Sequence, residues 1–118
     1  MPVFRNRETQ RVENVNGGEG AMIRDRLLNE EQIREFGGEC TYLAQITVEP
    51  HSSLGIHEHA GEGELYFITS GSALYVEDDV EYEVSAGDAL FCASGSTHGI
   101  KNPGDEVLTF VAIIMQNK

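Results

Sequence analysis

Two histidines and a glutamate stand close together near the middle of the chain, in the stretch His57-Glu58-His59 and then at Glu64. In an extended segment alternate residues share one face, so His57 and His59 can present both imidazoles in the same direction. The glycines between His59 and Glu64 allow the backbone to turn and bring the carboxylate toward the same point. Two imidazoles and one carboxylate suit a divalent transition metal such as Mn, Fe, Ni, Co or Zn. The spacing therefore indicates a metal site that needs one further ligand.

His98 is the candidate for that further ligand. It lies in the strand-like segment 97–100, far from His57 in the sequence, and antiparallel pairing can bring such distant positions opposite each other. We therefore predict one divalent metal bound by His57, His59, Glu64 and His98. His51 belongs to the turn at residues 49–53, and we expect it to be an exposed loop residue.

The elements that must position these ligands are mostly short strands. From residue 41 onward the apolar residues follow a period of two, with turn signals roughly every eight to twelve residues, which is typical of an all-β sandwich or barrel. A hairpin turn is expected at Asp78-Asp79. The expected strands are 21–28, 42–48, 73–77, 80–84, 89–92, 97–100 and 107–114.

One short helix is expected near the N-terminus. Asn29 is a suitable N-cap, Gln32 completes a capping box three residues later, and a pair of glycines from residue 37 ends the helix. Residues 1–16 are polar and lack a sustained period, so we expect a loose arm, or a strand ordered only against a partner. The sequence therefore predicts an N-terminal arm, 1–16, and a single domain, 17–118.

Composition limits the functions that the chain can have. Its 118 residues, 40% hydrophobic and 24% charged, are normal for one globular domain. The net charge of −12 repels phosphate backbones and anionic lipids, so we expect neither nucleic-acid nor membrane binding. Cys40 and Cys92 form no CxxC pair, and no signal peptide or membrane-spanning apolar run is visible. We therefore expect a cytoplasmic protein with free thiols.

The ligand residues also resemble the two sequence motifs of the cupins. The first motif is Gly, five residues, His-x-His, three or four residues, Glu, six residues, Gly; the second is Gly, five residues, Pro-x-Gly, two residues, His, three residues, Asn. The matching positions in this chain are His57, His59, Glu64, Gly71, Gly87, Gly95, His98 and Asn102. The chain departs from the motifs at two turn positions, with His51 in place of the opening Gly and Ala93 in place of Pro.

From about residue 41 to 114 the chain is similar to small single-domain cupins of the cupin 2 conserved-barrel type, such as those like oxalate decarboxylase. The resemblance implies a double-stranded β-helix, or jelly-roll, barrel with the four ligands inside it and two coordination positions open. It also implies a metal-dependent enzyme acting on a small oxygenated acid or related metabolite, by decarboxylation, dioxygenation or isomerisation. The alternative is a non-catalytic module that binds or senses a small ligand through the metal.

Four further residues are candidates for the site. Tyr66 shares the face of Glu64, while Tyr42 and Gln45 lie on a strand whose inward face the pattern leaves open, and all three are candidate substrate contacts. Glu62 is on the same side of an extended chain as Glu64 and is a candidate proton shuttle, although a solvated loop glutamate is the simpler interpretation. An exposed apolar face, for instance alternate residues of 107–114 or the first strand, also predicts a homodimer.

Overall fold

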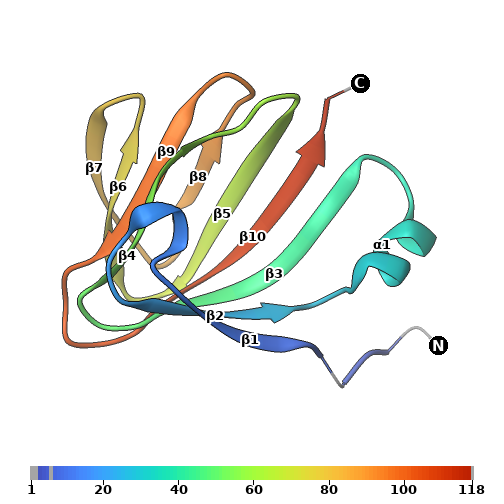
Figure 1. The fold of residues 1–118 in the computed structure, drawn as a ribbon, viewed down its shortest axis with the longest axis horizontal. Coiled ribbons are helices and arrows are strands. Elements are labelled where there is room, and N and C mark those ends of the chain that lie inside the picture. Colours follow the sequence, from blue (N-terminus) through green and yellow to red (C-terminus); the bar gives the residue numbers. More distant parts are fainter. Residues whose placement is uncertain (1–2, 6, 118) are drawn as a thin grey trace.

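Two antiparallel β-sheets face each other across a common core (Figure 1). In the computed structural model, which describes residues 3–5 and 7–117, the larger sheet has the strand order β1-β2-β3-β10-β5-β8 and the smaller has β4-β9-β6-β7. The strands are β1 (Thr9–Glu13), β2 (Ala21–Arg26), β3 (Cys40–Val48), β4 (Ser52–Glu58), β5 (Glu62–Ser70), β6 (Ser72–Glu77), β7 (Val80–Ser85), β8 (Ala89–Cys92), β9 (Thr97–Asn102) and β10 (Leu108–Gln116). The prediction of an all-β jelly-roll barrel is confirmed.

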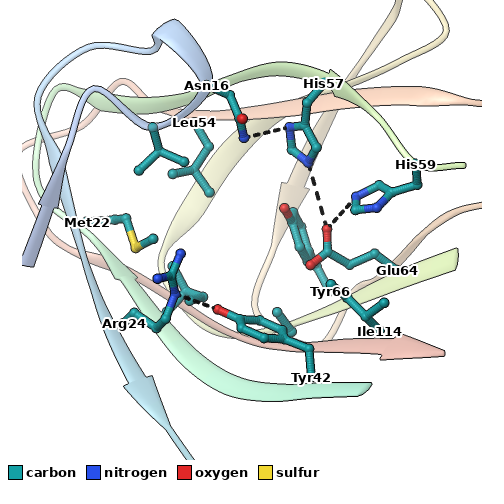
Figure 2. Close-up of a pocket in the computed structure, with 13 residues that line it drawn as sticks. Asn16, Met22, Arg24, Tyr42, Leu54, His57, His59, Glu64, Tyr66 and Ile114 are labelled. Atoms are coloured by element: carbon teal, nitrogen blue, oxygen red, sulfur yellow. Dashed lines mark hydrogen bonds and ion pairs between the residues drawn. The ribbon is translucent and has the colours of Figure 1, made fainter. Parts of the chain in front are cut away.

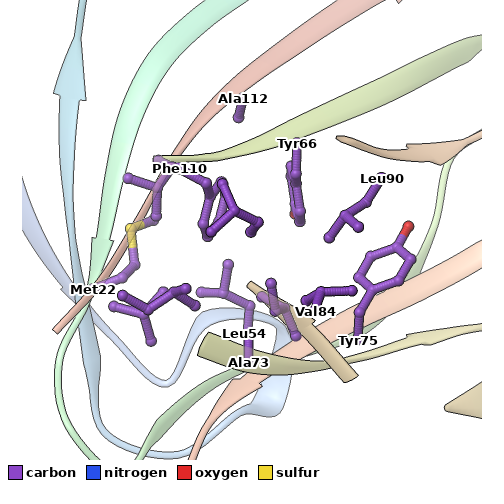
Figure 3. Close-up of a cluster of buried hydrophobic side chains, with 14 of the residues drawn as sticks. Met22, Leu54, Tyr66, Ala73, Tyr75, Val84, Leu90, Phe110 and Ala112 are labelled. Carbon is purple, nitrogen blue, oxygen red and sulfur yellow. The ribbon is translucent and has the colours of Figure 1, made fainter. Parts of the chain in front are cut away.

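The core lies between the two sheets, and the period of two explains its composition. In β10, Leu108, Phe110 and Ala112 are buried, while the residues between them face the outer side of the sheet. Figure 3 shows Phe110 of the larger sheet opposite Leu54 and Val84 of the smaller one. Each strand therefore contributes one apolar face to the interior and leaves the other outside.

The predicted helix and hairpin are both present. Helix α1 (Glu30–Phe36) begins with the expected capping box, in which the Asn29 side chain accepts from the Gln32 backbone and the Gln32 side chain accepts from the Asn29 backbone, each at 2.9 Å. Asp78 and Asp79, between β6 and β7, have φ values of 47° and 67°, as the tight hairpin turn requires. No helix in the described part of the chain is long and apolar enough to cross a membrane.

The N-terminal arm is more ordered than the sequence predicts. Strand β1 pairs with β2 at the edge of the larger sheet, and Val15–Gly17 form a short 3₁₀ turn, η1. Arg11 Nε donates to Glu49 Oε2 at 2.8 Å, and Val12 packs against the core. Because Val12 is the only apolar residue of β1, the strand lacks the alternation that marks the others. Residues 1, 2 and 6 of the expected arm, and residue 118, lie outside the described residues.

A β-bulge in β4 determines where His57 points. The register between β4 and β9 shifts after Leu54, and His57 then pairs with His98. Leu54 enters the core and His57, three residues later, also points inward, because the bulge changes the alternation along the strand. Gly55 lies in the bulge beneath η1, where a Cβ atom would collide with the backbone carbonyl of Asn16. The bulge and the close approach of η1 therefore depend on glycine at position 55.

Replacing Gly55 by alanine is expected to destabilise the fold, because the atoms that the new methyl group meets belong to the backbone. Such overpacking costs roughly 1–3 kcal/mol in the free energy of unfolding, which urea denaturation can measure. Gly104→Ala is the matched control, since a Cβ there has its nearest neighbour, Asn102 Oδ1, at 3.6 Å. Equal stability of the two variants would show that η1 does not pack closely on β4.

Candidate metal centre

Three strands bring the four predicted ligands to one point inside the barrel. Strand β4 carries His57, with His59 just beyond its end, while β5 carries Glu64 and β9 carries His98. His59, Glu64 and His98 are buried, and His57 is partly exposed. One ligand atom from each residue lies within 4.8 Å of all the others. The structure thus forms the His₃Glu cluster that the sequence predicts, with donors that can hold a metal ion.

Four of the separations between the ligand atoms are those of neighbouring ligands around one ion. Glu64 Oε1 lies 2.9 Å from His59 Nε2, 3.1 Å from His98 Nε2 and 3.9 Å from His57 Nε2. His98 Nε2 lies 3.0 Å from His57 Nε2 and 3.1 Å from His59 Nε2. With bonds of about 2.1 Å to a central ion, two ligands at right angles stand roughly 3.0 Å apart. One proton on His98 Nε2 could not form hydrogen bonds to His57, His59 and Glu64 at once. A cation between the four ligand atoms would attract all of them.

Hydrogen bonds fix the other ring nitrogen of His57 and of His59. His57 Nδ1 lies 2.9 Å from the carbonyl oxygen of Gly55, and His59 Nδ1 lies 3.1 Å from Glu62 Oε2. A carbonyl or carboxylate oxygen only accepts, so we assign the proton of each neutral imidazole to Nδ1. Nε2 of both rings is then unprotonated and faces the cluster, which is the form that binds a metal.

A tyrosine fixes His98 in the same way. The Tyr75 hydroxyl donates its only proton to Glu77 Oε1 at 2.8 Å, so at 3.0 Å from His98 Nδ1 it must accept. Burial, followed by the interactions with Glu77, raises the pKa of Tyr75 well above its ordinary value, so the phenol stays protonated. His98 therefore carries its proton on Nδ1 and turns an unprotonated Nε2 toward Glu64.

The charge of the cluster is centred on Glu64. Burial by itself would raise the pKa of this carboxyl, but its interactions with the three histidines outweigh burial and lower the pKa to about 2. The same carboxylate raises the pKa of His57, and at 3.9 Å its effect is electrostatic rather than a hydrogen bond. Burial lowers the pKa of His98, which favours the neutral ring. Metal binding requires an ionised carboxylate and neutral imidazoles, so the pKa shifts of Glu64 and His98 favour it, whereas the raised pKa of His57 opposes it.

A pocket of about 250 Å³ opens in front of the cluster (Figure 2). His57, His59 and Glu64 line it, whereas the fully buried His98 does not. Its other lining residues are Val15, Asn16, Met22, Arg24, Tyr42, Ile46, Leu54, Tyr66, Ala112 and Ile114. A water molecule needs about 10–15 Å³ of such volume, so the pocket has room for several waters. The pocket is thus large enough for a small metabolite next to the ligand cluster.

The candidate substrate contacts are divided between the two faces of the larger sheet. Tyr42 and Tyr66 line the pocket, and Tyr66 stacks on His98 with ring centres 4.9 Å apart. Gln45 does not line the pocket, which corrects the expectation for this residue. Because Tyr42, Ala44 and Ile46 turn inward, the alternation of β3 places Gln45 on the outer face.

Glu62 and His51 have structural contacts of different kinds. Glu62, the candidate proton shuttle, does not line the pocket; its carboxylate accepts from His59 Nδ1, so it orients a ligand of the cluster. His51 is exposed, as expected, and its Nε2 lies 2.7 Å from Asp105 Oδ1. His51 has a φ of 57°, which explains why the cupin motif has glycine at this position.

Two pocket residues, Asn16 and Arg24, were not predicted. Asn16 belongs to η1 and its side-chain amide lies 3.1 Å from His57 Nδ1, while Arg24 belongs to β2. With the proton of His57 on Nδ1, we assign the amide orientation in which Asn16 Oδ1 accepts from it. Both precede the motif region, and no spacing links them to the ligands. The one available signal was the charged run Arg24-Asp25-Arg26 within the otherwise apolar strand that begins at Ala21.

Both cysteines are free, as the sequence predicts. Burial, followed by the charges of Glu77, Asp78 and Glu64, raises the pKa of the Cys92 thiol to about 11. Cys92 is therefore a protonated, buried side chain at neutral pH and does not add a thiolate ligand to the cluster.

Known proteins resemble this chain in sequence and in fold. A family model described as Cupin domain, Cupin_2, matches residues 44–114. An oxalate-binding protein of Thermotoga maritima is 33% identical over 106 residues, which cover 90% of this chain and 85% of that protein. An uncharacterised protein of Methanocaldococcus jannaschii is 29% identical over 87 residues, covering 74% of this chain and 66% of that protein. A crystal structure described as a predicted oxalate decarboxylase from Thermotoga maritima has a TM-score of 0.86 at 32% identity and covers 92% of each chain.

Replacing Tyr75 by phenylalanine is expected to weaken metal binding, because His98 Nδ1 loses the acceptor that fixes its tautomer. Losing a hydrogen bond of this kind typically lowers metal affinity roughly 10- to 100-fold, which competition with a chelator can measure. Tyr82→Phe is the matched control, since Tyr82 pairs with Tyr75 across the hairpin and is 50% exposed. An unchanged affinity for Tyr75→Phe would contradict the assigned role.

Proposed function

The chain belongs to the cupin family, and from this we propose that it holds a small carboxylic acid on one divalent transition metal bound by His57, His59, Glu64 and His98. The observation that carries the proposal is the orientation of the three imidazoles. Each Nδ1 already has a hydrogen-bond acceptor, so each Nε2 is directed at the Glu64 carboxylate. Three imidazoles and a carboxylate suit Mn, Fe, Ni, Co or Zn.

The protein residues would bind and orient the acid in front of the cluster. Four protein ligands would leave room on the metal for a small acid, and the metal, when bound, would supply a Lewis acid that polarises the oxygens of that acid. Met22, Leu54 and Ile114 give the pocket apolar walls, which exclude water and strengthen the electrostatic interactions inside. Oxalate is the first acid to test, because one relative is named an oxalate-binding protein.

Binding is the function that the geometry supports best, and catalysis is the second candidate. Decarboxylation of oxalate to formate and CO₂ consumes a proton, which must reach the carbon that loses CO₂. Among the described residues that line the pocket, the only carboxyl group belongs to Glu64, while Glu62 is bonded to His59. Catalysis of a decarboxylation, dioxygenation or isomerisation is favoured by the two open positions and by the neighbour described as a predicted oxalate decarboxylase.

Elemental analysis tests the metal site directly. Protein supplied with Mn, Fe or Ni is expected to retain about one ion per chain, and His57→Ala and His98→Ala are expected to lose it, because each removes one of four ligands. His51→Ala is the matched control, since His51 is exposed and outside the cluster. Wild-type protein without metal after supplementation would overturn the proposed function.

Titration of the metal-loaded protein with oxalate then separates the two candidates. Saturable binding without product supports the binding module, and formation of formate and CO₂ supports the enzyme. Absence of both binding and turnover, with oxalate and with other small keto- or hydroxy-acids, would contradict the proposal.

We also propose that two copies associate through the outer face of the larger sheet. Across β3, β10, β5 and β8 the outward positions are apolar residues, threonines, an alanine and one glutamine, without a charged side chain among the described residues. The large apolar residues of this face are Leu43, Leu65, Phe67, Phe91, Val111 and Ile113. The net charge of −12 makes the charged surfaces of two copies repel each other. The uncharged apolar face is therefore the surface through which two copies would form a symmetric dimer.

Light scattering at micromolar concentration is expected to give the mass of a dimer. Phe67→Glu and Phe91→Glu place a charge in the proposed interface, on residues that are 43% and 59% exposed, and are expected to give monomers. Val80→Glu changes an equally exposed residue (51%) on the smaller sheet and is the matched control. A monomeric mass for the wild-type protein would remove the dimer.

A further inference from the structure

Arg24 brings a positive charge into the pocket. It lines the pocket beside Met22, and its guanidinium donates from Nε to the Tyr42 hydroxyl at 2.7 Å and from Nη1 to Gln10 Oε1 at 3.4 Å. Within residues 3–5 and 7–117, Arg24 forms no ion pair, although the chain has twenty acidic residues and only eight basic ones. Its charge is therefore available to an anionic group in the pocket.

Tyr42 positions this guanidinium and can donate to the same group. Because the hydroxyl oxygen accepts from Arg24 Nε, its own proton remains free to donate. Burial raises the pKa of Tyr42, so the hydroxyl keeps that proton at neutral pH. The ring also lies beneath two guanidinium groups, with Arg24 Cζ at 5.8 Å and Arg26 Cζ at 5.3 Å from its centre.

The pocket therefore has two polar ends. Figure 2 shows Arg24 and Tyr42 on the side of the pocket away from His57, which stands with His59 and Glu64 at the other side. Apolar residues such as Met22, Leu54 and Ile46 also line the pocket. An anionic group that is not itself bound at the cluster would find complementary charge only at Arg24, among the described lining residues.

We propose that Arg24 and Tyr42 form a second anchor that selects dicarboxylic acids, with one carboxylate held at the His₃Glu cluster and the other hydrogen-bonded to Arg24 and Tyr42. This inference rests on the proposed function and names the ligand class for the same site. In oxalate the two carboxylates are joined directly and form one chelate. Malonate and succinate have a spacer between them, and this leaves one carboxylate free to reach the second anchor.

Calorimetric titration of the metal-loaded protein with matched ligands tests the anchor. Malonate and succinate are compared with their monoamides, which have nearly the same size but lack the second charge. Whichever of malonate and succinate binds more tightly is expected to bind roughly 10- to 100-fold more tightly than its own monoamide, because its second carboxylate forms a charge-assisted hydrogen bond. Arg24→Gln is expected to reduce that ratio to about one, because Arg24 supplies the positive charge that distinguishes a carboxylate from an amide.

Arg26→Gln is the matched control, since Arg26 lies on the same strand and near the same ring but borders a different surface, with Glu30, Glu31 and Arg34. If Arg24→Gln fails to fold, Tyr42→Phe and Arg24→Lys test the same anchor. Tyr42→Phe removes one hydrogen-bond donor. Arg24→Lys keeps the positive charge but lacks the planar pair of donors with which a guanidinium binds a carboxylate. Both are expected to lower the ratio.

A wild-type ratio near one, or a ratio that survives in Arg24→Gln, would overturn the second anchor. Metal content measured on the same samples separates this outcome from failure of the proposed function. Protein that retains its metal and binds oxalate or the monoamides, without preferring the longer diacids, still supports the carboxylate site but excludes the role of Arg24. Protein without metal or acid binding contradicts both.

Discussion

The pairing of β4 with β9 is the constraint on which the site depends. It places His57 directly opposite His98, although 41 positions separate them in the sequence. The pairing alone is insufficient, because a shift of one residue in a strand exchanges its inner and outer faces. The bulge after Leu54 provides that shift, and both Leu54 and His57 then face the interior. Glycine at position 55 permits the bulge to lie beneath the backbone of η1.

Burial of so many polar groups at one point requires hydrogen-bond partners for all of them. The carbonyl of Gly55, the carboxylate of Glu62 and the Tyr75 hydroxyl supply these partners, one for each imidazole. No buried side-chain nitrogen or oxygen among the described residues lacks a hydrogen-bond partner. The same contacts fix the tautomers, so the network that makes burial tolerable also prepares the nitrogens for a metal. Stability and function of the site thus share one set of interactions.

Local patterns predicted the features that depend on neighbouring residues. The His57-x-His59 spacing, the capping box at Asn29 and the Asp78-Asp79 turn are all set within a few residues, and the structure contains each one. The position of Gln45 was not predictable, because a period of two shows which residues share a face but not which face turns inward. Arg24 was missed for a related reason. It reaches the pocket through the pairing of β2 with β3, which no local spacing encodes.

The central claim is that the three histidines and Glu64 bind one metal ion inside the barrel. Anomalous diffraction from crystals loaded with Co²⁺ or Zn²⁺ tests it most directly. The account predicts one ion bonded by Nε2 of His57, His59 and His98 and by a carboxylate oxygen of Glu64. Each Nδ1 should keep its hydrogen bond to the acceptor identified above. An ion bound through Nδ1, an ion elsewhere on the protein such as beside His51 and Asp105, or no ion at all would contradict the account.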